Sequence, residues 1–219
     1  MTSGTRAPSP REPRQERSRL TREGLLRSAI EALAQDGWAA TTVAAVAERA
    51  GVSRGAAQHH FPTREDLITA VLEQVFDDMT ATAGTALATL PEDAGDRVVA
   101  AVGRAVTIYT GTEFKAALQV WAAAASDPVL RELILPMEDR FARAAHRMTV
   151  LALDPEGRYP DSHRIAQVTL DLARGLGLAD TLSDDSRRRA QVVGTWTDLV
   201  TLALRSSVPG PTNAVTTDD

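Results

Sequence analysis

The sequence of 219 residues contains no cysteine. Disulfide bonds, catalytic thiolates and thiolate ligands for metals are therefore excluded, and stability must come from packing. No apolar run reaches the roughly 18 residues that a membrane-spanning helix needs. Residues 1–17 are polar and proline-rich, without the apolar stretch of a secretory signal peptide. We expect a cytoplasmic protein with no membrane partner.

Lysine is almost absent too, because Lys115 is the only one and nearly all positive charge is guanidinium. A formal net charge of -5 disfavours a protein that coats nucleic acid. The charge is uneven, however. Residues 1–27 contain seven arginines and three glutamates, whereas residues 71–219 contain 14 basic and 21 acidic groups. A basic N-terminal segment is thus attached to an acidic body. Arginine suits bidentate contacts, although GC-rich codon usage gives the same ratio.

Motifs of common catalytic and phosphate-binding sites are also missing: there is no nucleophile elbow, glycine-rich phosphate loop or HExxH. His59 and His60 are adjacent, so a helix would point them about 100 degrees apart and they could not easily chelate one ion. His146 and His163 flank a loop, where a solvated face is the alternative to a site. The sequence predicts no enzyme, cofactor or metal.

The periodic segments read as helices, because apolar residues recur at spacings of three and four and β-branched alternation is missing. We expect an all-α protein with a disordered basic arm over residues 1–17 and a flexible tail over 208–219. Pro136 should kink or split the helix that contains it. The expected helices cover about residues 20–35, 43–50, 54–60, 64–83, 94–110, 113–126, 128–152, 162–179 and 184–206.

Two short helices joined at a glycine-containing turn predict a helix-turn-helix. Thr42 and Ser53 are N-cap residues for the two helices, Gly51 ends the first, and small Ala47 lies where they would cross. Thr63 and Asp66 form an acidic capping box that opens the next helix. The second short helix would lie in the major groove of DNA. Its predicted DNA-facing residues are Ser53, Arg54, Gly55, Gln58 and His59, and the inward-facing residues are Val46, Val52, Ala57 and Phe61.

Residues 20–72, with GWAATTVAAVAERAGVSRGAAQHHFPTREDLITAVL at their centre, resemble the DNA-binding domain of the TetR family of transcriptional regulators. The resemblance covers about a quarter of the chain. It implies an N-terminal three-helix DNA-binding domain (residues 18–64, with a linker helix over 64–83) and a larger C-terminal helical ligand-binding and dimerisation domain (84–207). A homodimer would bind a near-palindromic double-stranded DNA operator, most often as a repressor. By motif match, phosphate-contacting positions are Thr42, Arg54, His60 and Arg64, and positions near bases are Gly55, Ala56 and His59.

One departure from the family pattern keeps a second function open. Ala57 and Gln58 stand where the family usually has a bulky apolar residue followed by tyrosine. Gln58 can still pair with adenine or contact phosphate, so DNA binding is retained. The operator sequences of other family members are then a poorer guide to the operator of this protein. The alternative is a small-molecule binding protein whose helix-turn-helix serves protein contacts instead of DNA.

The acidic body carries the few large, adaptable side chains of the central helices. They could line a cavity for a small apolar effector, or they could simply form the core. The resemblance implies a pocket without naming its ligand. The candidate pocket residues are Tyr109, Phe114, Trp121, Met137, Phe141 and Met148.

The last two predicted helices carry apolar stripes, which predict a four-helix interface when the pair meets its symmetry mate. Packing within the chain is the alternative for each residue. Gly175 and Gly177 interrupt the first stripe, at a cost of roughly 1 kcal/mol each in helix stability, but permit close helix approach. The candidate interface residues are Ile165, Val168, Leu172, Leu176, Val193, Trp196 and Val200.

Overall fold

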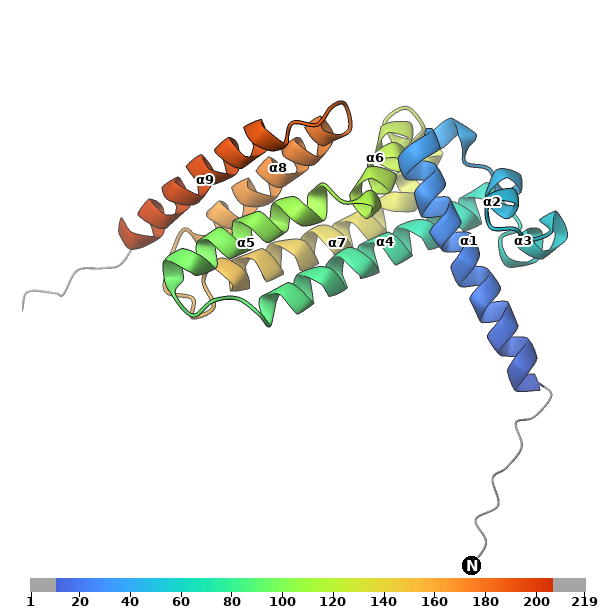
Figure 1. Ribbon diagram of the computed structural model, residues 1–219, viewed down its shortest axis with the longest axis horizontal. Helices are drawn as coiled ribbons and strands as arrows, with labels where there is room; N and C mark the ends of the chain where they lie inside the picture. Colours follow the sequence, from blue (N-terminus) through green and yellow to red (C-terminus); the bar gives the residue numbers. More distant parts are fainter. Residues whose placement is uncertain (1–10, 207–219) are drawn as a thin grey trace, which may run out of the picture. The chain divides into compact units, whose positions relative to one another are not determined.

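A computed structural model describes residues 11–206 of the chain. Over that range it contains nine α-helices and no strand, which confirms the all-α prediction (Figure 1). No helix in this part of the chain is long and apolar enough to cross a membrane. The helices are α1 Arg11–Ala40, α2 Val43–Arg49, α3 Arg54–His60, α4 Arg64–Leu87, α5 Ala94–Tyr109, α6 Thr112–Ala124, α7 Pro128–Leu153, α8 Ser162–Asp180 and α9 Ser186–Ser206.

Two boundaries differ from the sequence prediction. Helix α1 begins at Arg11, so residues 11–17 of the expected arm are helical, whereas residues 1–10 and the tail 208–219 lie outside the described residues. Helix α7 runs unbroken through Pro136, so the helix is not split there as the sequence had suggested it could be. Pro136 removes one backbone hydrogen bond to the carbonyl of Glu132. Both residues are exposed, so water can satisfy that carbonyl and the helix continues.

The chain divides into two compact units, and the first contains the N-terminal residues through Phe76 together with Ala116–Met137. In this unit α1, α2 and α3 contact one another in all three pairs. Gly37 has φ 83°, a left-handed conformation that costs glycine little, and it breaks α1 before the last three residues. The apolar core contains Leu25, Leu26, Ala29, Leu33, Val46, Ala47, Ala57, Phe61, Leu67, Ile68 and Val71.

The second unit contains Asp77–Lys115 and the chain from Glu138 onward. Here α5 packs against both α8 and α9, and their shared core contains Val98, Ala101, Val102, Ile165, Ala166, Val200 and Leu204. Close approach occurs at Gly177, where an added Cβ would overlap the Tyr109 carbonyl oxygen and lie 2.7 Å from Phe114. An added Cβ at Gly175 would meet open space. Of the two expected glycines, only Gly177 serves helix packing.

Candidate functional site

The helix-turn-helix is built by two capped helices and a tight turn. The Thr42 hydroxyl accepts a hydrogen bond from the Ala45 amide (3.1 Å), and the Ser53 hydroxyl accepts one from the Ala56 amide (3.2 Å). Both predicted N-caps are therefore confirmed. Gly51 has φ 68° in the turn, where the Val52 amide donates to the Ala47 carbonyl. The caps and the glycine together fix the entry angle of α3.

Small residues let α2 and α3 pack closely on α1. Ala57 is fully buried and Ala47 nearly so, and both lie with Val46 and Phe61 in the core of the first unit. Val52 is half-buried. The inward face was therefore predicted correctly, and the unusual Ala57 fills an interior position where a bulkier side chain would need room.

The outer face of α3 carries most of the residues predicted to meet DNA. Thr42, Ser53, Arg54, Gly55, Gln58 and His59 are exposed, whereas Ala56, His60 and Arg64 are half-buried. Within residues 11–206, no carboxylate forms an ion pair with the Arg54 guanidinium. Arg54 is the first residue of α3, so an uncompensated positive charge stands at a helix N-terminus, which itself attracts anions.

Arg64 has a structural contact that the sequence did not indicate. Its guanidinium stacks on the Trp38 ring, 3.9 Å from the centroid, and donates a hydrogen bond to the Trp38 carbonyl. Burial lowers the pKa of Arg64 from its ordinary value. The Trp38 amide in turn donates to the Gln119 side chain (3.4 Å). Arg64 thus holds the corner between α1 and α2, and a phosphate would have to share it with Trp38.

His60 differs in its charge from the nearby Arg22. Burial, and then the nearby His59 and Arg22, lower the pKa of His60 below its ordinary value, so the ring is neutral at pH 7 and offers hydrogen bonds rather than charge. The His59 and His60 rings meet edge to face with centroids 5.6 Å apart. In the described part of the chain, no three His, Asp or Glu side chains gather as metal ligands do.

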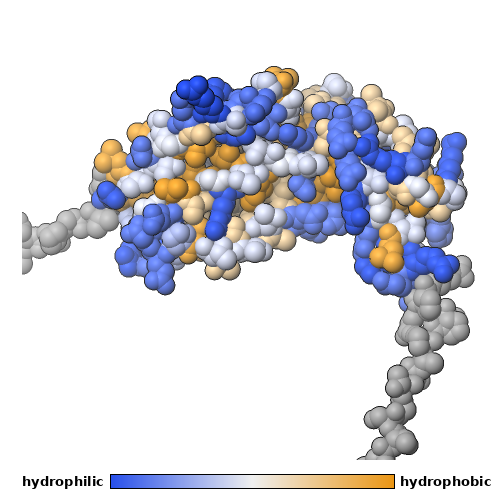
Figure 2. Space-filling model, viewed as in Figure 1, coloured by the Kyte–Doolittle hydropathy of each residue, from blue (hydrophilic) through white to orange (hydrophobic). Residues whose placement is uncertain are grey.

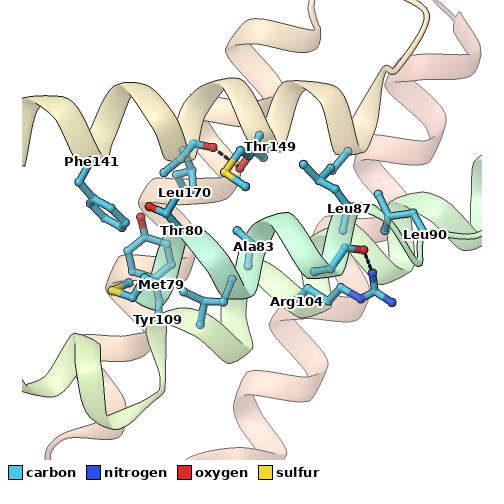
Figure 3. A pocket seen from close by; sticks show the side chains of 17 residues that line it. Met79, Thr80, Ala83, Leu87, Leu90, Arg104, Tyr109, Phe141, Thr149 and Leu170 are labelled. Atoms are coloured by element: carbon cyan, nitrogen blue, oxygen red, sulfur yellow. Dashed lines mark hydrogen bonds between the residues drawn. The ribbon is translucent and has the colours of Figure 1, made fainter. Parts of the chain in front are cut away.

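A cavity of about 60 Å³ lies within the second unit, among α4, α5, α7 and α8 (Figure 3). Tyr109, Phe141 and Met148 line it, as the sequence proposed. Phe114 instead packs edge to face on Tyr109 (5.0 Å between centroids), and Trp121 and Met137 belong to the first unit. Sequence reasoning missed the α4 wall. The full lining is Met79, Thr80, Ala83, Ala86, Leu87, Leu90, Ala101, Arg104, Ala105, Ile108, Tyr109, Phe141, Ala145, Met148, Thr149, Ala152 and Leu170.

The candidate interface residues of α8 and α9 fall into two groups. Ile165, Leu176 and Val200 are buried in the chain's own core, so they cannot form a surface for a partner. Ile165 of α8 and Val200 of α9 are buried because both helices pack against α5. Helices α8 and α9 carry apolar residues on two faces, and the face that contains Ile165 and Val200 is the one turned toward α5. Val168 is exposed, and Leu172, Val193 and Trp196 are half-buried.

The outward side of α8 and α9 remains partly apolar. Trp196 donates its indole N–H to the buried Thr169 hydroxyl (3.0 Å), and its ring lines an open groove with Leu172, Val192 and Leu199. Leu199 and Leu202 are more than half exposed. Figure 2 shows apolar residues among polar ones along these two helices.

Comparison with known proteins agrees with the helix-turn-helix geometry. The model of the family described as bacterial regulatory proteins, tetR family, matches residues 25–71. The HTH-type transcriptional regulator CymR of Pseudomonas putida is 31% identical over 179 residues, which cover 81% of this chain and 87% of CymR. The chain belongs to the TetR family. It is accordingly a helix-turn-helix, DNA-binding transcriptional regulator and not an enzyme.

Other TetR relatives and structures resemble it over most of its length. The HTH-type transcriptional regulator BetI of Stenotrophomonas maltophilia is 28% identical over 142 residues, covering 64% of this chain and 72% of BetI. A transcriptional regulator from a Rhodococcus species has a TM-score of 0.67 at 22% identity, covering 87% of this chain and 99% of its own. A putative regulator from Saccharomonospora viridis, crystallised with choline, has a TM-score of 0.64 at 22% identity, covering 84% and 96%. At these identities the two structures support the TetR fold alone.

Proposed function

We propose that this protein is a ligand-responsive transcriptional repressor that binds a near-palindromic operator as a homodimer. The observation that carries the proposal is the outer face of α3, where exposed Ser53, Arg54, Gln58 and His59 surround a capped helix N-terminus. Such a face fits the major groove, because the amide groups and Arg54 meet phosphate while Gln58 and His59 reach base edges. Thr42, Gly55 and Ala56 complete the surface.

The proposed dimer follows from the size of α3. A helix of seven residues reads only a few base pairs, too few for a specific site, whereas two copies related by a two-fold axis read two half-sites. We assign the interface to the outward side of α8 and α9, meaning Val168, Leu172, Trp196, Leu199 and Leu202. Exposed apolar side chains of this kind on a monomer mark an association surface.

The cavity of the second unit supports the response to a ligand. Its walls are mainly apolar, which suits a small apolar effector. A structural relative from Saccharomonospora viridis was crystallised with choline, a cation, so that complex supports ligand binding by this fold and not the apolar class. Binding would favour one spacing of the two α3 helices over another, with a coupling of typically about 1 to 3 kcal/mol that acts equally on effector and DNA affinity.

A mobility-shift assay with the DNA upstream of the protein's own gene tests the proposed function. We expect a specific, salt-sensitive complex whose stoichiometry is two chains per operator. The alternative, a small-molecule binding protein whose helix-turn-helix contacts another protein, predicts no preference for any DNA at matched salt. That result, on protein shown to be folded, would remove the DNA-binding proposal.

Replacing Arg54 by alanine should weaken operator binding by roughly 1 to 3 kcal/mol, because the substitution removes the unpaired guanidinium at the start of α3. A titration of labelled operator at fixed salt measures the loss. Arg143→Ala is the matched control, since Arg143 is exposed on α7 in the other unit and its loss changes net charge equally. Equal affinities of the two variants would contradict the assignment of Arg54.

A further inference from the structure

Three buried polar atoms of the second unit lack hydrogen-bond partners: the Tyr109 hydroxyl, Oε2 of Glu138 and Nε of Arg174. Tyr109 is only 2% exposed. An unpaired buried polar group is costly, and native proteins contain few of them. The Tyr109 hydroxyl proton is therefore available to a bound molecule, because a guanidinium such as that of Arg174 donates hydrogen bonds and cannot accept this proton.

The three side chains lie close together. The Arg174 guanidinium carbon is 5.7 Å from the centre of the Tyr109 ring. Arg174 acts on the Tyr109 hydroxyl through its charge and through a hydrogen bond in which the guanidinium can only donate. Glu138 acts on the hydroxyl through its charge, and Arg174 acts on Glu138 in the same way. Glu138 precedes the cavity residue Phe141 by about one turn of α7. Figure 3 shows the Tyr109 hydroxyl directed from α5 toward Thr80 and Phe141, at one end of the cavity.

The remaining polar groups of the cavity are largely occupied. Arg104 donates to the carbonyls of Ala86 and Thr89, and the Thr149 hydroxyl donates to the Ala145 carbonyl (2.8 Å). The lining contains no acidic residue. A hydrogen bond at the Tyr109 end can therefore fix the orientation of a ligand whose body fills the apolar part.

The charges around Tyr109 select against ionised ligands. Burial raises the pKa of the Tyr109 hydroxyl, which thus keeps its proton and acts as a donor. Burial also raises the pKa of Glu138, which favours the neutral carboxyl, so Glu138 offers a ligand cation no counter-charge. A ligand carboxylate would find only Arg104 in the lining, and that guanidinium already donates to the carbonyls of Ala86 and Thr89. A ligand cation would be repelled by Arg104 and would find no acidic residue in the lining to pair with. Burying such an unpaired charge costs far more free energy than burying a hydrogen-bonded hydroxyl.

We propose that the cavity binds a small, uncharged, mainly apolar molecule with one hydroxyl group, a phenol or an alcohol, whose oxygen accepts a hydrogen bond from Tyr109. This inference rests on the proposed function and deepens it, because it names the class of the effector. One buried water needs about 10 to 15 Å³ by the same kind of measure, so the cavity of about 60 Å³ is several times larger.

Calorimetry on the full-length protein with four compounds of one shape tests the chemical class. The compounds are para-ethylphenol, ethylbenzene, para-ethylbenzoate and para-ethylbenzylamine, which are hydroxylated, apolar, anionic and cationic at neutral pH. We expect para-ethylphenol to bind about tenfold more tightly than ethylbenzene, the effect of one hydrogen bond to a buried donor. The two charged compounds should bind more weakly still. The proposal would be overturned if ethylbenzene bound as tightly as para-ethylphenol, or if either charged compound bound more tightly than para-ethylphenol. It would also be overturned if para-ethylphenol did not bind.

Tyr109→Phe tests the residue. The ring and its contact with Phe114 stay, and the hydroxyl makes no well-formed hydrogen bond, so the melting temperature should change little. The roughly tenfold preference for para-ethylphenol should disappear while ethylbenzene affinity is unchanged. Tyr159→Phe is the matched control, because Tyr159 is the only other tyrosine and lies outside the cavity lining. Retention of the preference in Tyr109→Phe would refute the assignment.

The proposed regulator function and the proposed ligand class are tested by different measurements. Operator binding by the ligand-free protein reports the regulator function and needs no effector. Calorimetry reports the ligand class and needs no DNA. A protein that binds its operator but prefers ethylbenzene refutes the hydroxyl proposal alone.

Discussion

Gly177→Ala should lower the melting temperature by roughly 6 to 12 °C, which corresponds to about 3 kcal/mol for a chain of this size. The added Cβ would overlap the Tyr109 carbonyl oxygen and press on the Phe114 ring, and the first of these is backbone that cannot rotate away. Helix α8 must then move off α5, which costs more than the roughly 1 kcal/mol that alanine gains over glycine in a helix.

Gly175→Ala is the internal control, because it changes the same helix two residues earlier. Its Cβ would enter open space, so the melting temperature should stay equal or rise by a few degrees. Thermal unfolding followed by circular dichroism measures both variants. A Gly177→Ala protein as stable as Gly175→Ala would show that α8 and α5 do not pack at this point.

Leu199→Asp should convert the proposed dimer into monomers and reduce operator affinity by at least about 100-fold, since several kcal/mol are lost when an unpaired charge is buried at an interface. Leu199 is 53% exposed in the single chain, so the substitution should leave the monomer folded. Light scattering and an operator titration measure the two effects, and a monomer cannot span two half-sites.

Val129→Asp provides the comparison, because Val129 is an equally apolar, more exposed residue on α7 in the other unit. It should remain dimeric and bind the operator normally. Trp196→Asp is a poorer probe of the interface, because loss of the bond to Thr169 would also loosen α8 and α9 within one chain. A dimeric, DNA-competent Leu199→Asp protein would exclude this face.

Local signals in the sequence predicted local structure well. The hydroxyls of Thr42 and Ser53 cap α2 and α3, and Thr63 and Asp66 exchange bonds as the predicted capping box, because each pair is set by neighbours three residues apart. Pro136 was the exception, since an exposed carbonyl tolerates the missing donor.

Long-range partners could not be predicted in the same way. Periodicity marks a face as apolar without saying which neighbour covers it, so Ile165 and Val200 were assigned to a partner although α5 buries them. The sequence alone carries no pattern that indicates the cavity wall formed by α4. The same holds for the hydrogen bond from Trp38 to Gln119, which lie 81 positions apart in the chain. Close approach at Gly177 but not at Gly175 also depends on the crossing point of two helices.

The position of Trp196 gives the protein a built-in optical probe. One edge of its indole is fixed by the bond to Thr169, while its ring lines the open groove beside Leu199. Indole emission shifts to shorter wavelength when water leaves the ring, so covering the groove changes the colour of the light that this residue emits. The sequence has only two other tryptophans, Trp38 and Trp121. With both replaced by phenylalanine, simple dilution in a fluorimeter would follow self-association without any label.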